Sequence, residues 1–202
     1  HKSSKGETYE VINPANEEII GKASKASSKD VDKALLSAQK GLEVWKKTPP
    51  WQRAYILRRI ADKMREKQDI LAKWMTLEVG KPFAEAKGEV NGAADIYEWN
   101  AEETKRIYGQ TVESRFEDTR VHVYYQPVGV VAALVPWNFP LVLSARKIST
   151  ALAAGCSVIV KPDVITPGVV MEQVEICREC GVPPGVVNLL SGDPPSIAQQ
   201  LI

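Results

Sequence analysis

The chain has 202 residues, which is enough for one sizeable hydrophobic core or for one domain with an appended arm. Its 26 basic and 25 acidic residues give a net charge of +1, and 44% of its residues are apolar. This composition is typical of a globular protein and indicates no nucleic-acid partner. The longest apolar run, around residues 128–137, is too short to span a bilayer, and no signal-type apolar core follows a cationic start. We therefore expect a cytoplasmic protein without a membrane partner.

The first 45 residues are predicted to form a hairpin followed by a helix. Residues 10–12 and 18–20 are short apolar segments on either side of a proline-containing turn, which is typical of a strand pair. Ser27 and Asp30 then resemble a capping box. Apolar residues recur at helical spacing over residues 31–45, so the sequence predicts an amphipathic helix there.

Further helices precede a polar segment that changes to strand period. One helical pattern, from residue 54 to residue 80, either continues throughout or restarts in its middle, and another begins at Pro82 and extends to about Tyr108. Residues 113–119 are polar, and residues 120–125 then alternate as in a strand. An exposed alternating strand needs a partner edge. That edge belongs either to another chain or to a hairpin packed on its own domain.

Strands and helices alternate from residue 129 onward. The expected elements are strand 129–135, helix 140–154, strand 157–161, helix 168–180 and strand 186–190. This alternation implies an α/β fold in which a Rossmann-like parallel sheet is built with right-handed crossovers. Ligands of such sheets bind at the carboxyl ends of the strands. Those ends carry the three most unusual turns of the sequence, at residues 136–138, 161–164 and 191–193.

The turn Pro136-Trp137-Asn138-Phe139-Pro140 delivers one polar side chain, Asn138, to this edge of the sheet. The amide of Asn138 can donate a hydrogen bond to an oxygen that becomes negative during acyl-transfer chemistry. Alternatively, Asn138 only caps the helix that begins after it. The spacing alone leaves both interpretations open.

The cysteines and histidines favour packing over metal or redox chemistry. Cys177 and Cys180 form a Cys-Arg-Glu-Cys motif, but the motif lies at the end of a predicted helix, where the helix dipole disfavours a thiolate. Cys156 opens a predicted buried strand, so we expect three packed thiols and no nucleophile among them. The two histidines, His1 and His122, are not at ligand spacing with other donors, and we predict no metal site.

Seven stretches together resemble the aldehyde dehydrogenase superfamily, and they occur in the same order as in that family. They are Thr76–Pro82, Trp99–Gly109, Pro127–Val131, Pro136–Pro140, Lys161-Pro162, Thr166-Pro167 and Gly181–Asn188. The resemblance runs from about Val11 to the C-terminus and is most similar to succinate-semialdehyde dehydrogenases. It implies NAD(P)-dependent oxidation of an aldehyde to its acid through a covalent intermediate on a cysteine, with Asn138 as one oxyanion donor.

The resemblance also implies a domain organisation. Residues 1–109 correspond to the helical part of the cofactor-binding domain, residues 110–128 to an oligomerisation arm and residues 129–202 to its βαβαβ part. We therefore expect a protruding strand arm and a homodimer or homotetramer. Family members are far longer than this sequence, so we expect an N-terminal portion that lacks the catalytic domain and is inactive by itself.

The expected cofactor site lacks the usual glycine-rich fingerprint, because no Gly-x-Gly-x-x-Gly follows the first predicted strand. In the family, the lysine after the second strand holds the adenosine end, so Lys161 is expected to contact the ribose or a phosphate on it. The alternative for Lys161 is a solvated strand terminus. The other residues expected to bind the cofactor are Val135, Pro136, Trp137, Asn138, Pro162, Val164 and Gly192.

Val164 departs from the pattern of NAD-preferring relatives, which commonly carry a glutamate three residues after this lysine. A carboxylate there would accept hydrogen bonds from the ribose hydroxyls and repel a 2′-phosphate, whereas valine does neither. The sequence therefore favours NADP, or tolerance of both NADP and NAD.

Arg146 is the candidate substrate-binding residue, because it stands in an apolar part of the predicted helix 140–154. In succinate-semialdehyde dehydrogenases an arginine here binds the substrate carboxylate, and hydroxyaldehyde oxidisers such as lactaldehyde dehydrogenases are similar at this point. A structural ion pair with Glu102 or Glu103 is the alternative for Arg146.

A second hypothesis for the function of the whole chain belongs to another class of protein. The chain would then be a non-catalytic nucleotide-binding or structural relative.

Overall fold

The computed structural model describes residues 3–202, and His1 lies outside the described residues. At its centre is a parallel sheet of three strands in the order β5-β6-β7, which comprise Val130–Leu134, Ser157–Lys161 and Val187–Leu189. Helix α5 (Pro140–Ala153) connects the first two strands and α6 (Pro167–Glu179) the last two. The expected α/β fold with its parallel sheet is confirmed, and each element lies within about one residue of the predicted bounds.

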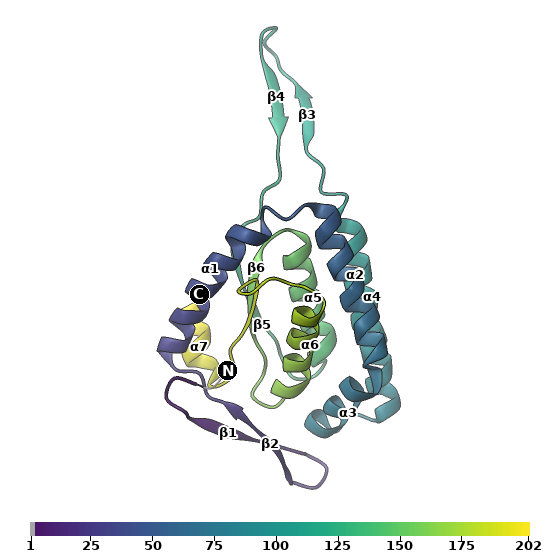
Figure 1. Ribbon diagram of the computed structural model, residues 1–202, viewed down its shortest axis with the longest axis vertical. Coiled ribbons are helices and arrows are strands. Elements are labelled where there is room, and N and C mark those ends of the chain that lie inside the picture. The colour runs from purple at the N-terminus through teal and green to yellow at the C-terminus, as the bar shows by residue number, and fades with distance from the viewer. Residues whose placement is uncertain (1–2) are drawn as a thin grey trace.

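Helices cover both faces of this sheet (Figure 1). Two successive crossovers in one direction place α5 and α6 on the same face, and α2, α3 and α4 pack behind them. The opposite face is covered by α1 and α7. The bounds of these helices are Ser28–Trp45 for α1, Pro50–Glu66 for α2, Gln68–Val79 for α3, Phe83–Thr104 for α4 and Pro194–Leu201 for α7.

The central strand β6 shows why the fold has three layers. All five of its residues are buried, and alternate side chains enter different cores. Val158 and Val160 belong to the large core on the side of α2–α6, whereas Ile159 belongs to the smaller core shared with α1 and α7. A strand that is apolar on both faces is typical of a parallel sheet covered on both sides.

The N-terminal elements follow the sequence pattern closely. Strands β1 (Thr8–Ile12) and β2 (Ile19–Ser24) form an antiparallel hairpin. The capping box before α1 is present, with the backbone N–H of Ser27 donating to the Asp30 carboxylate at 2.9 Å. The long helical pattern restarts at residue 68, so it forms two helices.

Helix α4 ends earlier than the sequence indicated. Its last residue is Thr104, one turn before the expected end at about Tyr108. The amphipathic pattern persists beyond this point, but Gly109 approaches another backbone: a Cβ there would lie 2.4 Å from the carbonyl oxygen of Val123. A side chain at position 109 therefore does not fit, and the chain enters the arm directly afterwards, at Gln110.

Strands β3 (Gln110–Glu113) and β4 (Arg120–Val123) form an antiparallel hairpin that projects away from the body of the molecule (Figure 1). All eight strand residues are exposed. The protruding strand arm is therefore present, and the alternative of a hairpin packed on its own domain is not what the structure shows. Its role in oligomerisation stays a prediction, as do the domain bounds at residues 109 and 128.

Candidate functional site

The carboxyl edge of the parallel sheet brings the three expected turns together. The backbone N–H of Val135 donates to the carbonyl of Lys161 at 2.9 Å, and that of Leu190 donates to Val160 at 2.9 Å. Because β6 is the middle strand, Lys161 lies between the end of β5 and the end of β7. The expected cofactor residues therefore share one edge, although they lie up to 57 positions apart in the sequence.

The Asn138 turn is exposed at this edge. Residues 136–139 are all solvent-exposed, and Trp137 and Phe139 show 49% and 51% of their surface. Within residues 3–202 the Asn138 side chain makes no hydrogen bond, while its backbone carbonyl accepts one from Nζ of Lys81 at 3.3 Å. The amide is thus available to a ligand.

The capping alternative for Asn138 is wrong, because another residue caps α5. The carboxylate of Glu89 accepts hydrogen bonds from the backbone N–H groups of Leu141 and Val142 at 3.0 and 3.2 Å. Glu89 is buried and also pairs with Lys81. Free N–H groups at a helix start need such an acceptor.

A second buried carboxylate does the same for α6. Glu78 accepts hydrogen bonds from the backbone N–H groups of Gly168 and Val169 at 2.6 and 3.1 Å. Burial raises the pKa of Glu78 to about 7, and the two N–H donors partly oppose that rise. Both helix starts next to the candidate site are therefore filled by carboxylates of the chain itself.

Sequence reasoning missed Glu78, Glu89 and Lys81. The two glutamates fall at buried positions on the apolar stripes of α3 and α4, respectively. A charged residue on an otherwise apolar stripe is seldom buried without a partner, and this was the available signal. Such a charge indicates that a buried partner exists, but the sequence does not identify that partner.

Lys161 is buried at the end of β6, and burial lowers its pKa. The neighbouring carboxylates of Asp163 and Asp193 oppose this shift, but no ion pair of Lys161 is found within the described part of the chain. A buried ammonium of this kind can bind a hydroxyl or an anionic ligand. Val164, half-buried, follows three residues later.

Gly192 closes the third turn of the edge. Its φ of +132° lies in a region that side chains rarely adopt, and a Cβ there would lie 3.0 Å from the backbone nitrogen of Ala26. The turn is further fixed by Ser191, whose backbone carbonyl accepts from the N–H of Ala26 at 2.8 Å. The segment before α1 thus packs directly on the end of β7.

Arg146 lies exposed on α5, two turns after the helix start. The two glutamates considered as ion-pair partners of Arg146 have other partners. Glu102 pairs with Arg58 and Lys105, and Glu103 pairs with Arg106. Among the residues that the structure describes, Arg146 forms no ion pair, and only its backbone carbonyl accepts a hydrogen bond, from Thr150. Its guanidinium is available to an anion.

The three cysteines are free and buried. Burial raises the pKa of Cys177 to about 12 and also raises that of Cys180. All three thiols are packed, as expected, and the raised pKa makes Cys177 and Cys180 poor nucleophiles. The described residues contain no group of three or more His, Cys, Asp or Glu side chains that could hold a metal ion, and no helix among them is long and apolar enough to cross a membrane.

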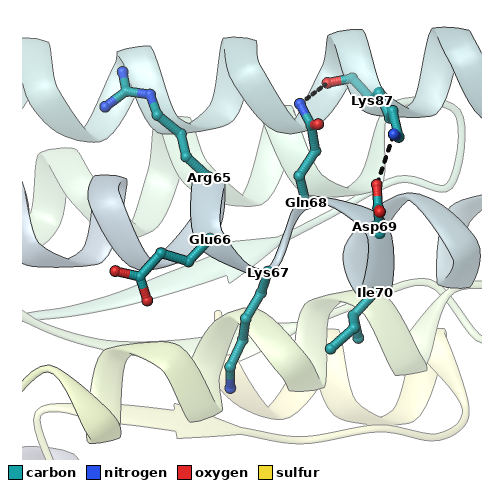
Figure 2. Close-up of a pocket in the computed structure, with 7 residues that line it drawn as sticks. All are labelled: Arg65, Glu66, Lys67, Gln68, Asp69, Ile70 and Lys87. Atoms are coloured by element: carbon teal, nitrogen blue, oxygen red, sulfur yellow. Dashed lines mark hydrogen bonds and ion pairs between the residues drawn. The ribbon is translucent and has the colours of Figure 1, made fainter.

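A cavity of about 260 Å³ lies elsewhere, at the break between α2 and α3 (Figure 2). Its lining is Arg65–Ile70 with Lys87. The cations of this cavity already have partners: Lys87 pairs with Asp69 at 2.7 Å and Arg65 with Glu98 at 2.7 Å. None of the predicted site residues lines it.

The parallel sheet carries at its carboxyl edge a buried lysine and an amide that has no partner in residues 3–202, and it defines the chain as an α/β domain of the class that binds ligands at this edge. Residues 1–202 match the aldehyde dehydrogenase family, and the chain belongs to that family.

Several curated relatives are semialdehyde dehydrogenases. The glutarate-semialdehyde dehydrogenase of Pseudomonas aeruginosa is 43% identical over 97% of this chain and 41% of its own length. The succinate-semialdehyde dehydrogenase (NADP(+)) of Escherichia coli is 43% identical over 98% of this chain and 41% of its own length. The chain thus spans about 41% of the length of these relatives.

Solved structures agree with the assignment of the chain to the aldehyde dehydrogenase family. The crystal structure of succinate-semialdehyde dehydrogenase from Burkholderia pseudomallei has a TM-score of 0.98 and 39% identity, and it covers 100% of this chain and 42% of the solved one. The crystal structure of an Escherichia coli NADP-dependent enzyme has a TM-score of 0.98 and 42% identity, and the match covers 100% of this chain and 42% of the solved one.

Proposed function

We propose that the protein to which this chain belongs oxidises a semialdehyde, such as succinic semialdehyde, to the dicarboxylic acid. We propose NADP as the preferred cofactor, with NAD as the other candidate. Family membership and the identity to semialdehyde dehydrogenases support the reaction type. The observation that carries the substrate class is Arg146, an exposed guanidinium without an ion pair in the described residues, on the helix that starts at the Asn138 turn.

The chain's own residues have distinct roles in this proposal. Lys161 binds the adenosine ribose or a phosphate on it, and its burial without an ion pair in residues 3–202 fits a polar or anionic ligand. The other proposed cofactor contacts come from Val135, Pro136, Trp137, Asn138, Pro162, Val164 and Gly192. When bound, the cofactor accepts a hydride from the substrate carbon.

Asn138 acts on the acyl chemistry itself. Its amide donates a hydrogen bond to the substrate oxygen as negative charge develops there, and such a donor is worth about 3 kcal/mol in the transition state. The nucleophilic cysteine of the reaction is none of the chain's three, because all three are buried and burial raises the thiol pKa of Cys177 and Cys180. Arg146 binds the distal carboxylate through charge-assisted hydrogen bonds.

The test compares kcat/KM for succinic semialdehyde and butyraldehyde in the whole protein. An arginine that binds the carboxylate should favour the semialdehyde by about 1.5 to 3 kcal/mol, because hydrogen bonds to charged groups have that strength. Arg146→Leu should remove the preference while leaving butyraldehyde oxidation nearly intact. Lys147→Leu, at the exposed neighbouring position on α5, is the matched control and should leave the preference unchanged.

Other outcomes would contradict parts of the proposal. A preference that survives Arg146→Leu would reject carboxylate binding and favour a hydroxyaldehyde, such as lactaldehyde, or a neutral aldehyde. Cofactor binding in a folded protein that oxidises no aldehyde would contradict the enzymatic function and support a non-catalytic nucleotide-binding protein.

A further inference from the structure

The Asn138 turn is held by very few contacts. The backbone of Val135, before the turn, belongs to the sheet, and Phe139 accepts the first hydrogen bond of α5, from Leu143. Between them, and within the described residues, the hydrogen bond that reaches Asn138 comes from Nζ of Lys81, at 3.3 Å from its carbonyl oxygen. The orientation of this residue therefore depends on a side chain 57 positions away in the sequence.

Lys81 is itself held tightly. Its side chain is only 10% exposed and pairs with the carboxylate of Glu89, which is 2% exposed. Nζ also lies 4.0 Å from the centroid of the Phe139 ring, where a cation is attracted by the face of the ring. Lys81 thus contacts the two consecutive residues Asn138 and Phe139.

Glu89 connects this lysine to the other side of the turn. Its carboxylate accepts the backbone N–H groups of Leu141 and Val142, so one ion pair joins the start of α5 to the carbonyl of Asn138. Because the pair is almost completely buried, solvent screens it only weakly. The pair contributes no net charge to the site, and its contacts with the Asn138 carbonyl and the start of α5 act on the geometry of the turn.

We propose that Lys81 and Glu89 are positioning residues that orient the Asn138 amide toward the substrate oxygen, an inference that rests on the proposed function. Donors of this kind act only when they are held within about 0.5 Å of the productive geometry. The Asn138 side chain has no hydrogen-bond partner within residues 3–202, so its direction follows from the backbone, which Lys81 holds at the carbonyl.

The test measures kcat, KM and cofactor affinity in the whole protein. Lys81→Met removes the donor to the Asn138 carbonyl, and we expect kcat to fall by about 10- to 100-fold, since a misplacement of about 1 Å costs that much. KM and the cofactor Kd should stay within about twofold, because the amide acts mainly on charge in the transition state. Lys81→Arg keeps a cationic donor and should restore part of kcat.

Glu89→Gln is the milder second variant, which keeps the proposal testable if Lys81→Met does not fold. A glutamine oxygen can still accept from Leu141 and Val142, but it no longer holds Lys81 by charge. A fall in kcat at unchanged KM is again expected. Lys67→Met is the control, because it breaks a different ion pair, to Glu179 on α6, that is only partly buried, and it should lower stability without lowering kcat.

A double-mutant cycle with Asn138→Ala identifies the route of the effect. If Lys81 acts through Asn138, Lys81→Met should lower kcat by less than about twofold once the amide is gone. An equal fall in both backgrounds, or an unchanged kcat in Lys81→Met, would overturn the inference while leaving the proposed reaction intact. An unchanged kcat in Asn138→Ala would instead overturn the proposed role of Asn138, and this inference with it.

Discussion

Glu78 is the buried carboxylate at the start of α6, and it packs so closely on Gly168 that no larger residue fits there. A Cβ on Gly168 would lie 2.7 Å from Oε1 of Glu78 and equally close to the ring of Trp74, so only glycine fits beside the carboxylate. Burial raises the pKa of Glu78 to about 7 from the usual 4.5. A carboxyl group with a raised pKa binds its proton more tightly in the folded state than in the unfolded one.

The raised pKa of Glu78 makes the folded state less stable as the pH rises. The stabilisation from protonated Glu78 is fully present below about pH 4.5 and is lost as the pH rises through about 7. Glu78→Gln keeps an acceptor for only one of the two N–H groups, because they donate to different oxygens of Glu78, but its side chain does not ionise. The variant should therefore gain stability relative to the wild type between these pH values, by up to about 3 kcal/mol. Urea denaturation from pH 4 to pH 8 measures this, and parallel pH profiles for the two proteins would show that Glu78 does not titrate with folding.

Val164 is the residue that should decide between NADP and NAD. It stands half-buried in the loop after β6, three positions beyond Lys161. Val164→Glu should weaken NADP more than NAD by about 1 to 3 kcal/mol, because the new carboxylate repels a 2′-phosphate. Titration of both cofactors into the wild type and the variant gives the difference. Val164→Gln, which has similar size but no charge, is the control. Equal losses for the two cofactors in Val164→Glu would mean that this position does not contact the ribose.

At the scale of elements, the starts of α5 and α6 differ from those of helices that bind a phosphate through a glycine-rich turn. In many α/β folds the N-terminus of the first helix after a strand receives a phosphate group of the ligand. Here the N–H groups of both helices already donate to Glu89 and Glu78. Because these carboxylates occupy the helix starts, the N–H groups of Leu141, Val142, Gly168 and Val169 are not free to bind a phosphate.

The β3–β4 arm is an element without a core of its own. Its apolar side chains Val112, Val121 and Val123 are 36–44% exposed, and its strand edges have no further partner in the described residues. Exposed edges of this kind are usually protected by pairing. We therefore expect the arm to pair with another subunit.

Replacing residues 110–123 by a short glycine linker tests this expectation. The oligomer should dissociate into smaller species in analytical ultracentrifugation, because the pairing edge is gone. The melting temperature of the monomeric body should change little, since all eight strand residues are exposed. Val121→Lys is a point variant that should weaken the oligomer in the same direction. An unchanged mass for both variants would place the subunit contacts elsewhere.

At the scale of the whole molecule, the two cores are tied together by Trp45. This residue ends α1, yet its fully buried side chain belongs to the large core, and its indole N–H donates to the carbonyl of Leu152 on α5 at 2.9 Å. The helix on one face of the sheet is thereby fixed to a helix on the other. The carboxyl edge, with its three turns, is built on this common framework.

The sequence by itself determined the α/β alternation, the Asn138 turn and the position of Lys161. Helical and strand periods are local properties, and the prolines at positions 136 and 140 mark a turn wherever the chain lies. The apolar period continues past Thr104 and predicts a helix to about Tyr108, whereas the structure ends α4 at Thr104, before the chain enters the β3–β4 arm.

The tertiary structure alone decided which groups meet at the site. Glu78 reaches Gly168 across 90 positions, Glu89 reaches Leu141 across 52, and Lys81 reaches Asn138 across 57. A helical or strand period is local and does not encode contacts between residues so far apart in the sequence. A charge on an apolar stripe shows that a buried partner must exist, but the partner is known only once the helices are packed, because burial and hydrogen-bond geometry are properties of the assembled layers.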